Sequence, residues 1–206
     1  MPDRDPRSVL LIDMGGVFFT YAFQQALEHW AQAAGTPAQA LHKAWRIDDP
    51  FDRFERGEIE PAAYLAHLRR LLHLELDDAQ LTAGWNAIYG SVNADLVRLL
   101  RTPDVRARFA AVVAVSNTNA LHAPAWRRLY ERDLDVFDML VCSHEIGTTK
   151  PRPSFFDHIC TAHQVPRERL VLVDDIPEVT RAAAALGLTT HTYTDITPLQ
   201  SFLTTL

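Results

Sequence analysis

The sequence predicts an α/β fold, in which helices cover both faces of a parallel sheet and a helical insertion follows the first strand. In the second half of the chain, short and almost purely apolar runs alternate with segments of helical period, as in parallel strands buried on both faces. One further run near the N-terminus precedes a long stretch whose pattern stays helical. These two observations define the predicted architecture.

The first strand is predicted at residues 9–12, a continuous run of Val, Leu and Ile. The run stops at Asp13 and is followed by Gly15 and Gly16, which indicates a tight turn at the carboxyl end of the strand. Only 8 glycines occur in the chain, and two of them stand side by side here. We therefore take Asp13 as the first polar candidate at a strand end.

Four helical segments are predicted between about residues 22 and 92, with no strand among them. Their apolar residues recur at spacings of three and four, and Gly35 and Gly90 end the first and the last segment. The segments are built around Phe23, Leu27 and Trp30; Leu41, Ala44 and Trp45; Tyr64, Leu68 and Leu72; and Leu81, Trp85 and Tyr89.

The remaining elements alternate between strand and helix. Apolar runs predict strands at residues 109–115, 139–142, 170–173 and 188–193. Helical patterns predict helices at residues 120–130, from Pro153 through Ile159, and at 177–186. The chain is thus predicted to fold as a Rossmann-like core, residues 1–21 and 93–206, with a four-helix insertion at residues 22–92.

Composition and charge exclude several classes of protein. Because 20 Lys and Arg face 26 Asp and Glu, for a net charge of −6, we expect no nucleic-acid partner. No apolar run approaches the ~20 residues of a membrane span, and residues 1–8 lack the layout of a signal peptide. Cys142 and Cys160 have no CxxC companion, which favours free thiols. We expect a soluble, cytoplasmic protein.

Polar residues follow the predicted strands at their carboxyl ends. Asp13, Ser116 and the pair Asp174 and Asp175 each end an apolar run, and Lys150 follows the third strand. Ligands of open α/β sheets bind at this edge. Carboxylate oxygens suit Mg²⁺, whereas a hydroxyl, a helix N-terminus and a Lys suit a phosphate. The set predicts phosphoryl transfer assisted by a divalent cation.

Four segments, in this order, resemble the motifs of the haloacid dehalogenase-like hydrolase superfamily: Asp13-Met14-Gly15-Gly16-Val17, Ser116-Asn117, Lys150-Pro151-Arg152-Pro153 and Val173-Asp174-Asp175. The helical insertion resembles the cap of that superfamily. Two segments are similar to phosphatases of the sugar-phosphate (glucose-1-phosphatase-like) type, namely Arg56-Gly57-Glu58-Ile59 and Trp85-Asn86. Together with the insertion, these motifs extend the resemblance over nearly the whole chain.

The resemblance implies a phosphatase that acts on a small phosphorylated metabolite in two steps. Asp13 would attack phosphorus and form an aspartyl-phosphate, which water then hydrolyses. Ser116 and Asn117 would hold the phosphoryl oxygens. Lys150 would neutralise charge on both the nucleophile and the phosphate. Asp13, Ser116 and Lys150 are therefore the expected catalytic residues.

The resemblance also implies a bound Mg²⁺. Its expected ligands are Asp13, the backbone carbonyl of Gly15, and Asp174 or Asp175. The cation would offset the repulsion between the Asp13 carboxylate and the phosphate.

Gly15 departs from the pattern of the superfamily, which usually carries a second Asp there as general acid and base. Such help is worth about 10² to 10⁴ in rate, and its loss matters least for a good leaving group. We therefore predict a bias towards anomeric, acyl or aryl leaving oxygens, for example a sugar 1-phosphate. Glu55 or Glu58 of the insertion is an alternative proton donor.

Two other functions stay open. A 2-haloacid-type dehalogenase would use Asp13 to displace halide from carbon, but it would not need the cation ligands that Asp174 and Asp175 supply. A catalytically weak, phosphate-binding regulatory protein is favoured only by Gly15. The candidates for residues that line the substrate site are Trp45, Arg46 and Arg53. A homodimer is also an open alternative, in which two subunits would pair through an exposed face of a cap helix.

Overall fold

Five parallel strands form the main sheet of the computed structural model, which describes residues 7–206. In spatial order they are β5 (Met139–Cys142), β4 (Phe109–Ser116), β1 (Ser8–Asp13), β6 (Leu170–Asp174) and β7 (Thr189–Thr192). β1 lies in the centre and pairs with β4 and β6. The predicted α/β fold is confirmed, whereas the polar stretch at residues 1–6 lies outside the described residues.

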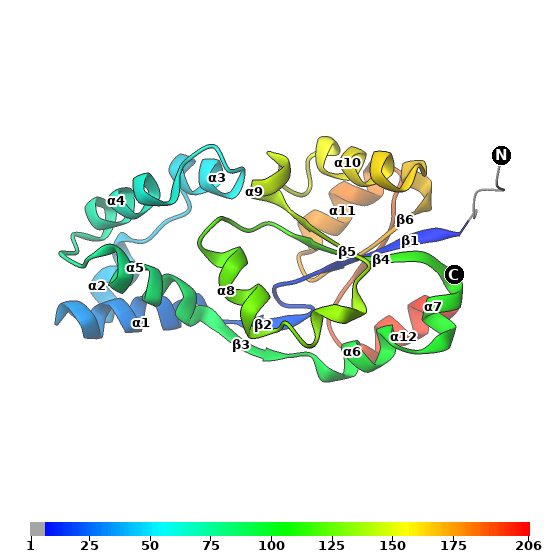
Figure 1. The fold of residues 1–206 in the computed structure, drawn as a ribbon, viewed down its shortest axis with the longest axis horizontal. Helices are drawn as coiled ribbons and strands as arrows, with labels where there is room; N and C mark the ends of the chain where they lie inside the picture. The colour runs from blue at the N-terminus through cyan, green and yellow to red at the C-terminus, as the bar shows by residue number, and fades with distance from the viewer. Residues whose placement is uncertain (1–6) are drawn as a thin grey trace.

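Helices cover both faces of this sheet (Figure 1). Along β1, Leu10 and Ile12 belong to one apolar cluster and Val9 and Leu11 to the other. The first face is covered by α6 (Ala94–Leu100), α7 (Pro103–Arg108) and α12 (Ile196–Thr204), the second by α10 (Pro153–His163) and α11 (Pro177–Ala185). A strand with both faces buried explains the continuous apolar run in the sequence.

Shorter elements surround the carboxyl edge of the sheet and its connections. After β4 and β5 come α8 (His122–Leu129) and α9 (Ser143–Ile146). Single 3₁₀ turns lie at Asn86–Ile88, Leu134–Val136 and Arg167–Arg169. Cys142 and Cys160 are free thiols. Among residues 7–206, no helix is both long and apolar enough to cross a membrane.

The chain leaves the core through β2 (Phe19–Tyr21) and returns through β3 (Tyr89–Val92), which pair antiparallel. The prediction that residues 22–92 contain no strand is therefore wrong at their end. Gly90 makes this pairing close, because a Cβ there would lie 2.3 Å from Thr20 Oγ1. Ser91 N also donates to Thr20 Oγ1, at 3.0 Å. Tyr89 continues the helical spacing of apolar residues although it belongs to β3, because its ring packs against the core.

The insertion forms a helical cap around its own apolar cluster, to the left in Figure 1. Its helices are α1 (Phe23–Ala34), α2 (Ala38–Ala44), α3 (Asp49–Glu55), α4 (Pro61–Leu72) and α5 (Asp78–Trp85). The sequence pattern did not predict α3, because Phe54 is its one buried residue. Asp48 begins this helix by accepting from Phe51 N at 3.1 Å. The division of the chain into domains at residues 22 and 92 stays a prediction.

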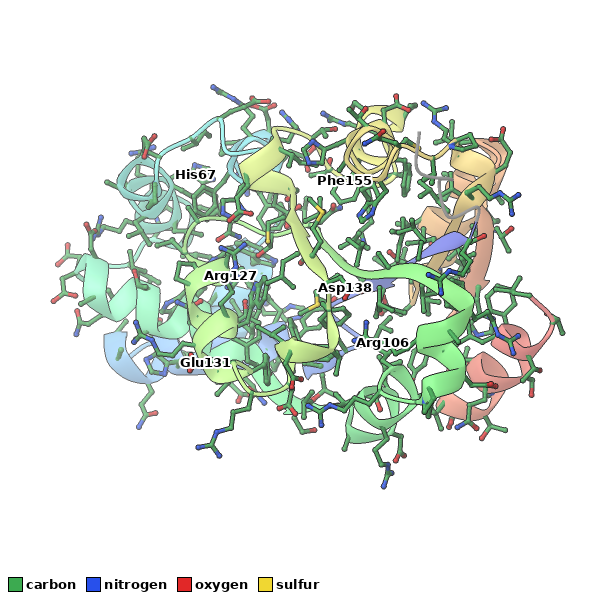
Figure 2. The ribbon with its side chains drawn as sticks, turned by 45° about the vertical axis from the view of Figure 1, so that its right-hand side comes forward. His67, Arg106, Arg127, Glu131, Asp138 and Phe155 are labelled. Atoms are coloured by element: carbon green, nitrogen blue, oxygen red, sulfur yellow. The ribbon has the colours of Figure 1, made fainter. Side chains whose placement is uncertain are left out.

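An ion pair ties α7 to the edge of the sheet. Figure 2 labels Arg106 and Asp138, whose Nη1 and Oδ2 atoms lie 3.0 Å apart. The same Asp138 oxygen accepts from Val112 N of β4, at 2.7 Å. Because a backbone donor and a guanidinium share this carboxylate, the start of β5 is fixed against β4.

Gly84 gives a test of the packing in the cap. A Cβ at this position would lie 2.1 Å from Nε1 of the buried Trp30, which donates to Leu81 O. We expect Gly84→Ala to lower the free energy of unfolding by about 1–3 kcal/mol, because overpacking outweighs the gain of about 1 kcal/mol in helix propensity. Chemical denaturation measures this. Ala83→Ser, on the exposed face of α5, is the control, and an equal loss there would contradict the packing argument.

Candidate active site

The carboxyl edge of the sheet brings the predicted polar residues together. Asp13 ends β1, Ser116 ends β4 and Asp174 ends β6, and all three are buried. Lys150 reaches the same place from the loop between α9 and α10. Together with Asn117, these residues line one cavity of about 430 Å³ between the core and the cap.

The Lys150 ammonium lies between two carboxylates. Its Nζ donates to Asp13 Oδ1 at 2.5 Å and to Asp174 Oδ2 at 2.6 Å. Only 3% of the Lys150 side chain is exposed. A buried charge is tolerated when it is paired and hydrogen-bonded, so the three side chains fix one another in place.

Asn117 holds the Lys150 loop through its side chain. Asn117 Nδ2 donates to Lys150 O at 2.9 Å, and Lys150 N donates to Asn117 Oδ1 at 2.8 Å. Sequence reasoning missed this contact, because the two residues are joined only by the fold. The expected role of the Asn117 amide towards phosphate stays a prediction.

Burial and mutual repulsion shift the pKa values of the carboxyl groups. Burial raises the pKa of Asp13 to about 7, although Lys150 opposes the shift. Burial and the neighbouring Asp174 raise the pKa of Asp175. Burial alone would lower the pKa of Lys150, but Asp13 and Asp174 raise it above its ordinary value. One ammonium thus faces three acids, and the cluster favours additional positive charge.

The three acids form a suitable site for a hard divalent cation. Asp13, Asp174 and Asp175 each offer one carboxylate oxygen, and these oxygens lie within 4.8 Å of one another. Asp174 is oriented by Ile176 N, which donates to its Oδ1 at 3.0 Å. A Cβ at Gly16, whose φ is +81°, would lie 2.1 Å from Asp175 Oδ2, so this glycine leaves room for the carboxylate. Oxygen donors of this kind fit Mg²⁺.

Tyr21 covers Gly15, where the superfamily usually has its second acid. A Cβ at Gly15 would lie 3.1 Å from Tyr21 Cε1 and 3.3 Å from Cδ1. A side chain at this position would therefore require the Tyr21 ring to move by a few tenths of an ångström. The role of the Gly15 carbonyl as a cation ligand stays a prediction.

Aromatic rings form most of the cavity wall above the acids. Contributors from β2 and the cap include Phe19, Tyr21, Phe23, Trp45, Phe51 and Trp85. Of the predicted lining residues, Trp45 is part of this wall, whereas Arg46 and Arg53 lie outside the residues that line it. Sequence reasoning did not single out Phe19, Tyr21 or Phe51, because no element was predicted at these residues. Phe23 has the helical spacing of a core position. The density of aromatics at residues 18–23 was the available signal.

His122 extends this apolar wall from α8. Its ring stacks on Trp85 at a centroid distance of 4.7 Å, and its Nδ1 lies 3.0 Å from Asn86 Oδ1. Burial lowers the pKa of His122 to about 3, so the ring is neutral near pH 7. His122 therefore adds no positive charge to the cavity.

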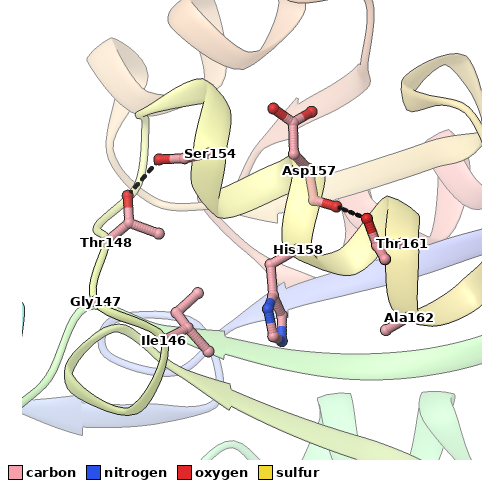
Figure 3. Close-up of a pocket in the computed structure, with 8 residues that line it drawn as sticks. All are labelled: Ile146, Gly147, Thr148, Ser154, Asp157, His158, Thr161 and Ala162. Carbon is pink, nitrogen blue, oxygen red and sulfur yellow. Dashed lines mark hydrogen bonds between the residues drawn. The ribbon is translucent and has the colours of Figure 1, made fainter.

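A second hollow, of about 520 Å³, lies between α10 and the loop that precedes it (Figure 3). Three hydroxyl side chains that line it are hydrogen-bonded within the protein. The Thr148 and Ser154 hydroxyls lie 2.7 Å apart, and Thr161 Oγ1 donates to Asp157 O at 2.8 Å. None of the predicted site residues lines it, so we place the chemistry in the first cavity.

Comparisons with known proteins agree with this arrangement. A family model described as haloacid dehalogenase-like hydrolase matches residues 8–187. The sesquiterpene phosphatase astK of Aspergillus oryzae is 27% identical over 183 residues, which cover 86% of this chain and 85% of that protein.

Solved structures share the fold. A HAD family enzyme, bt-2542, from Bacteroides thetaiotaomicron was solved with magnesium and inorganic phosphate. It matches with a TM-score of 0.76 and 24% identity, covering 91% of this chain and 94% of that one. A HAD-like family hydrolase from Porphyromonas gingivalis matches with a TM-score of 0.76 and 19% identity, covering 97% and 98%.

The raised pKa of Asp13 predicts how stability depends on pH when no divalent cation is bound. From about pH 4 to pH 7 the folded protein retains a proton that the unfolded chain has released, so its free energy of unfolding falls as pH rises. We expect Asp13→Asn to flatten this slope, so that the loss of stability between pH 5 and pH 8 becomes smaller by on the order of 1 kcal/mol or more. Denaturation in EDTA at several pH values measures this. The exposed Asp104→Asn is the control, and an unchanged slope in Asp13→Asn would contradict the prediction.

Proposed function

Because this chain belongs to the haloacid dehalogenase-like hydrolase family, we propose that it is a Mg²⁺-dependent phosphatase with Asp13 as its nucleophile. One observation carries the proposal: the Lys150 ammonium joins Asp13 to Asp174 in one cavity, and an oxygen of a third acid, Asp175, lies within 4.8 Å of both. A lysine and a cation site around one carboxylate suit the transfer of a phosphoryl dianion.

Asp13 is the group that attacks phosphorus in this proposal. It is the last residue of the central strand, where it pairs with Val115 of β4. Lys150 holds one oxygen of Asp13 and would neutralise charge on the entering phosphate. Ser116 and Asn117, at the end of β4, would hold the phosphoryl oxygens. The resulting aspartyl-phosphate is then hydrolysed by water.

Asp13, the Gly15 carbonyl, and Asp174 or Asp175 are the groups that would hold Mg²⁺. When bound, the cation supplies positive charge that reduces the repulsion between carboxylate and phosphate. Gly16 supports this role, because its missing Cβ admits the Asp175 carboxylate.

The cavity wall favours an apolar organic group on the phosphate. Aromatic rings would exclude water from an aryl or isoprenoid-like group, and each buried methylene contributes about 0.8 kcal/mol. The hydroxyls of a sugar 1-phosphate would lose hydrogen bonds to water against the same rings. The relative named a sesquiterpene phosphatase is consistent with this preference. We therefore propose apolar phosphomonoesters as the substrate class.

The alternative functions gain no support from the site. Two acids besides the nucleophile, Asp174 and Asp175, are of no use to a dehalogenase acting on carbon. A phosphate-binding regulatory protein would not need Asp13 and Lys150 in contact.

Phosphate release should depend on both Mg²⁺ and Asp13. We expect turnover of p-nitrophenyl phosphate with Mg²⁺, its loss in EDTA, and a decrease of at least about 10⁴-fold in Asp13→Asn, which removes the nucleophile. Release of nitrophenol and of inorganic phosphate measures this. Asp104→Asn should match the wild type. Activity that survives EDTA or Asp13→Asn would rule out the mechanism.

The aromatic wall should determine the choice of substrate. We expect kcat/KM to be at least about 10-fold higher for naphthyl or geranyl phosphate than for glucose 1-phosphate, because about 1.4 kcal/mol of differential binding suffices. Trp45→Ala should raise KM for the apolar substrates and leave glucose 1-phosphate unaffected. The exposed Leu129→Ala, outside the cavity, is the control. A preference for the sugar phosphate would contradict the proposed substrate class.

A further inference from the structure

Gly15 leaves the nucleophile without the usual acid two residues on, although a poor leaving oxygen must gain a proton as its bond to phosphorus breaks. We propose that Glu55, the last residue of α3, is the general acid and base of the reaction. This inference rests on the proposed phosphatase function. It also decides between the two cap acids that the sequence left open.

Glu55 lies over the site although it belongs to the cap. It lines the same cavity as Asp13, Gly15 and Lys150. Its backbone is held against the core, because Ser143 Oγ of α9 lies 2.6 Å from Glu55 O and also accepts from Thr118 N, at 2.9 Å. The end of α3 is thus fixed to the loops that carry the phosphate-binding residues.

Gly57 makes this close approach of cap and core feasible. A Cβ at Gly57, whose φ is +69°, would lie 2.3 Å from the backbone oxygen of His144 in α9. Only a residue without a side chain lets the cap loop pass so close to α9. Glu55, two residues earlier, is therefore held at a defined place in the cavity that Asp13 also lines.

The surroundings of Glu55 suit proton transfer near neutral pH. Burial raises the pKa of Glu55 to about 7, Asp52 of the same helix adds to the shift, and Lys150 opposes it. Tyr21 lines the same cavity, and His144 belongs to α9, which packs against α3. Burial raises the pKa of Tyr21 and lowers that of His144, so both are neutral near pH 7. Near pH 7, Glu55 can therefore both give and take a proton.

Glu58, the other cap acid, is unsuited to this role. It is exposed, and its carboxylate accepts from Arg56 Nε at 2.6 Å and from Arg53 Nε at 3.3 Å. The hydrogen bond from Arg56 lowers the pKa of Glu58. Glu58 is also absent from the residues that line the cavity, which makes it a matched control.

The proposed steps balance as follows. The Asp13 carboxylate forms a bond to phosphorus, the bond from phosphorus to the ester oxygen breaks, and that oxygen keeps the electron pair and takes the Glu55 proton. An alcohol leaves, and Glu55 becomes a carboxylate. Water then attacks phosphorus while Glu55 takes one of its protons, and the bond to Asp13 breaks with its electron pair on Asp13. Phosphate is released, and Glu55 is protonated again.

The test compares Glu55→Gln with Glu58→Gln on two monoesters that differ in the pKa of the leaving group. With an alkyl phosphate, Glu55→Gln should lose about 10²–10⁴-fold in kcat. With p-nitrophenyl phosphate, whose leaving group needs no proton, it should still release one nitrophenol per enzyme in a rapid burst. Slow turnover should follow, because water is no longer activated. Glu58→Gln should match the wild type on both.

Further outcomes separate a chemical role from a structural one. Glu55→Asp keeps the acid and should recover part of the alkyl phosphate activity. Glu55→Gln should lose the decline of kcat that deprotonation of Glu55 causes as the pH rises from about 7 to 8. Equal losses on both esters without a burst, or no loss, would overturn the role of Glu55. No phosphate release from any ester by the wild-type protein would instead refute the proposed function itself.

Discussion

The buried contact of Lys150 with Asp13 and Asp174 is the constraint on which the rest of the site depends. Neighbouring strands of a parallel sheet deliver two acids to one place, and these acids repel each other unless a positive charge lies between them. The ammonium comes from a loop that the Asn117 side chain holds in place, through hydrogen bonds to both the backbone N–H and the backbone carbonyl of Lys150. The sheet sets where the acids are, and the loop sets how much of their charge is neutralised.

The cap supplies what the sheet edge lacks. The core presents charge and hydrogen-bonding groups, whereas the cap and β2 present rings such as Phe23, Trp45 and Phe51. A phosphate and an apolar group on the same substrate would each meet a matching surface. Tyr21 links the two halves of the cavity, because its ring lies close to Gly15, two residues after Asp13.

Much of the core could be predicted from the sequence, because a strand buried on both faces needs a run of apolar residues and must end in a polar one. Asp13, Ser116 and Asp174 were found in this way. What escaped depends on contacts between distant segments. The helix α3 buries only Phe54, β3 forms only against β2, and the Ser143–Glu55 contact joins cap to core. Local periodicity carries no trace of such contacts.

The two crossings between core and cap lie side by side, with Tyr21 opposite Tyr89 and Ala22 N bonded to Ile88 O. The chain therefore leaves and re-enters the core at neighbouring positions, as at the ends of a hairpin loop. An insertion of another size could replace the cap without any change in the order of the core strands. Such an exchange would keep the nucleophile and its lysine. It would discard Glu55, however, so a new lobe would have to bring its own acid. In this chain, recognition of the substrate and transfer of the proton would evolve as one module.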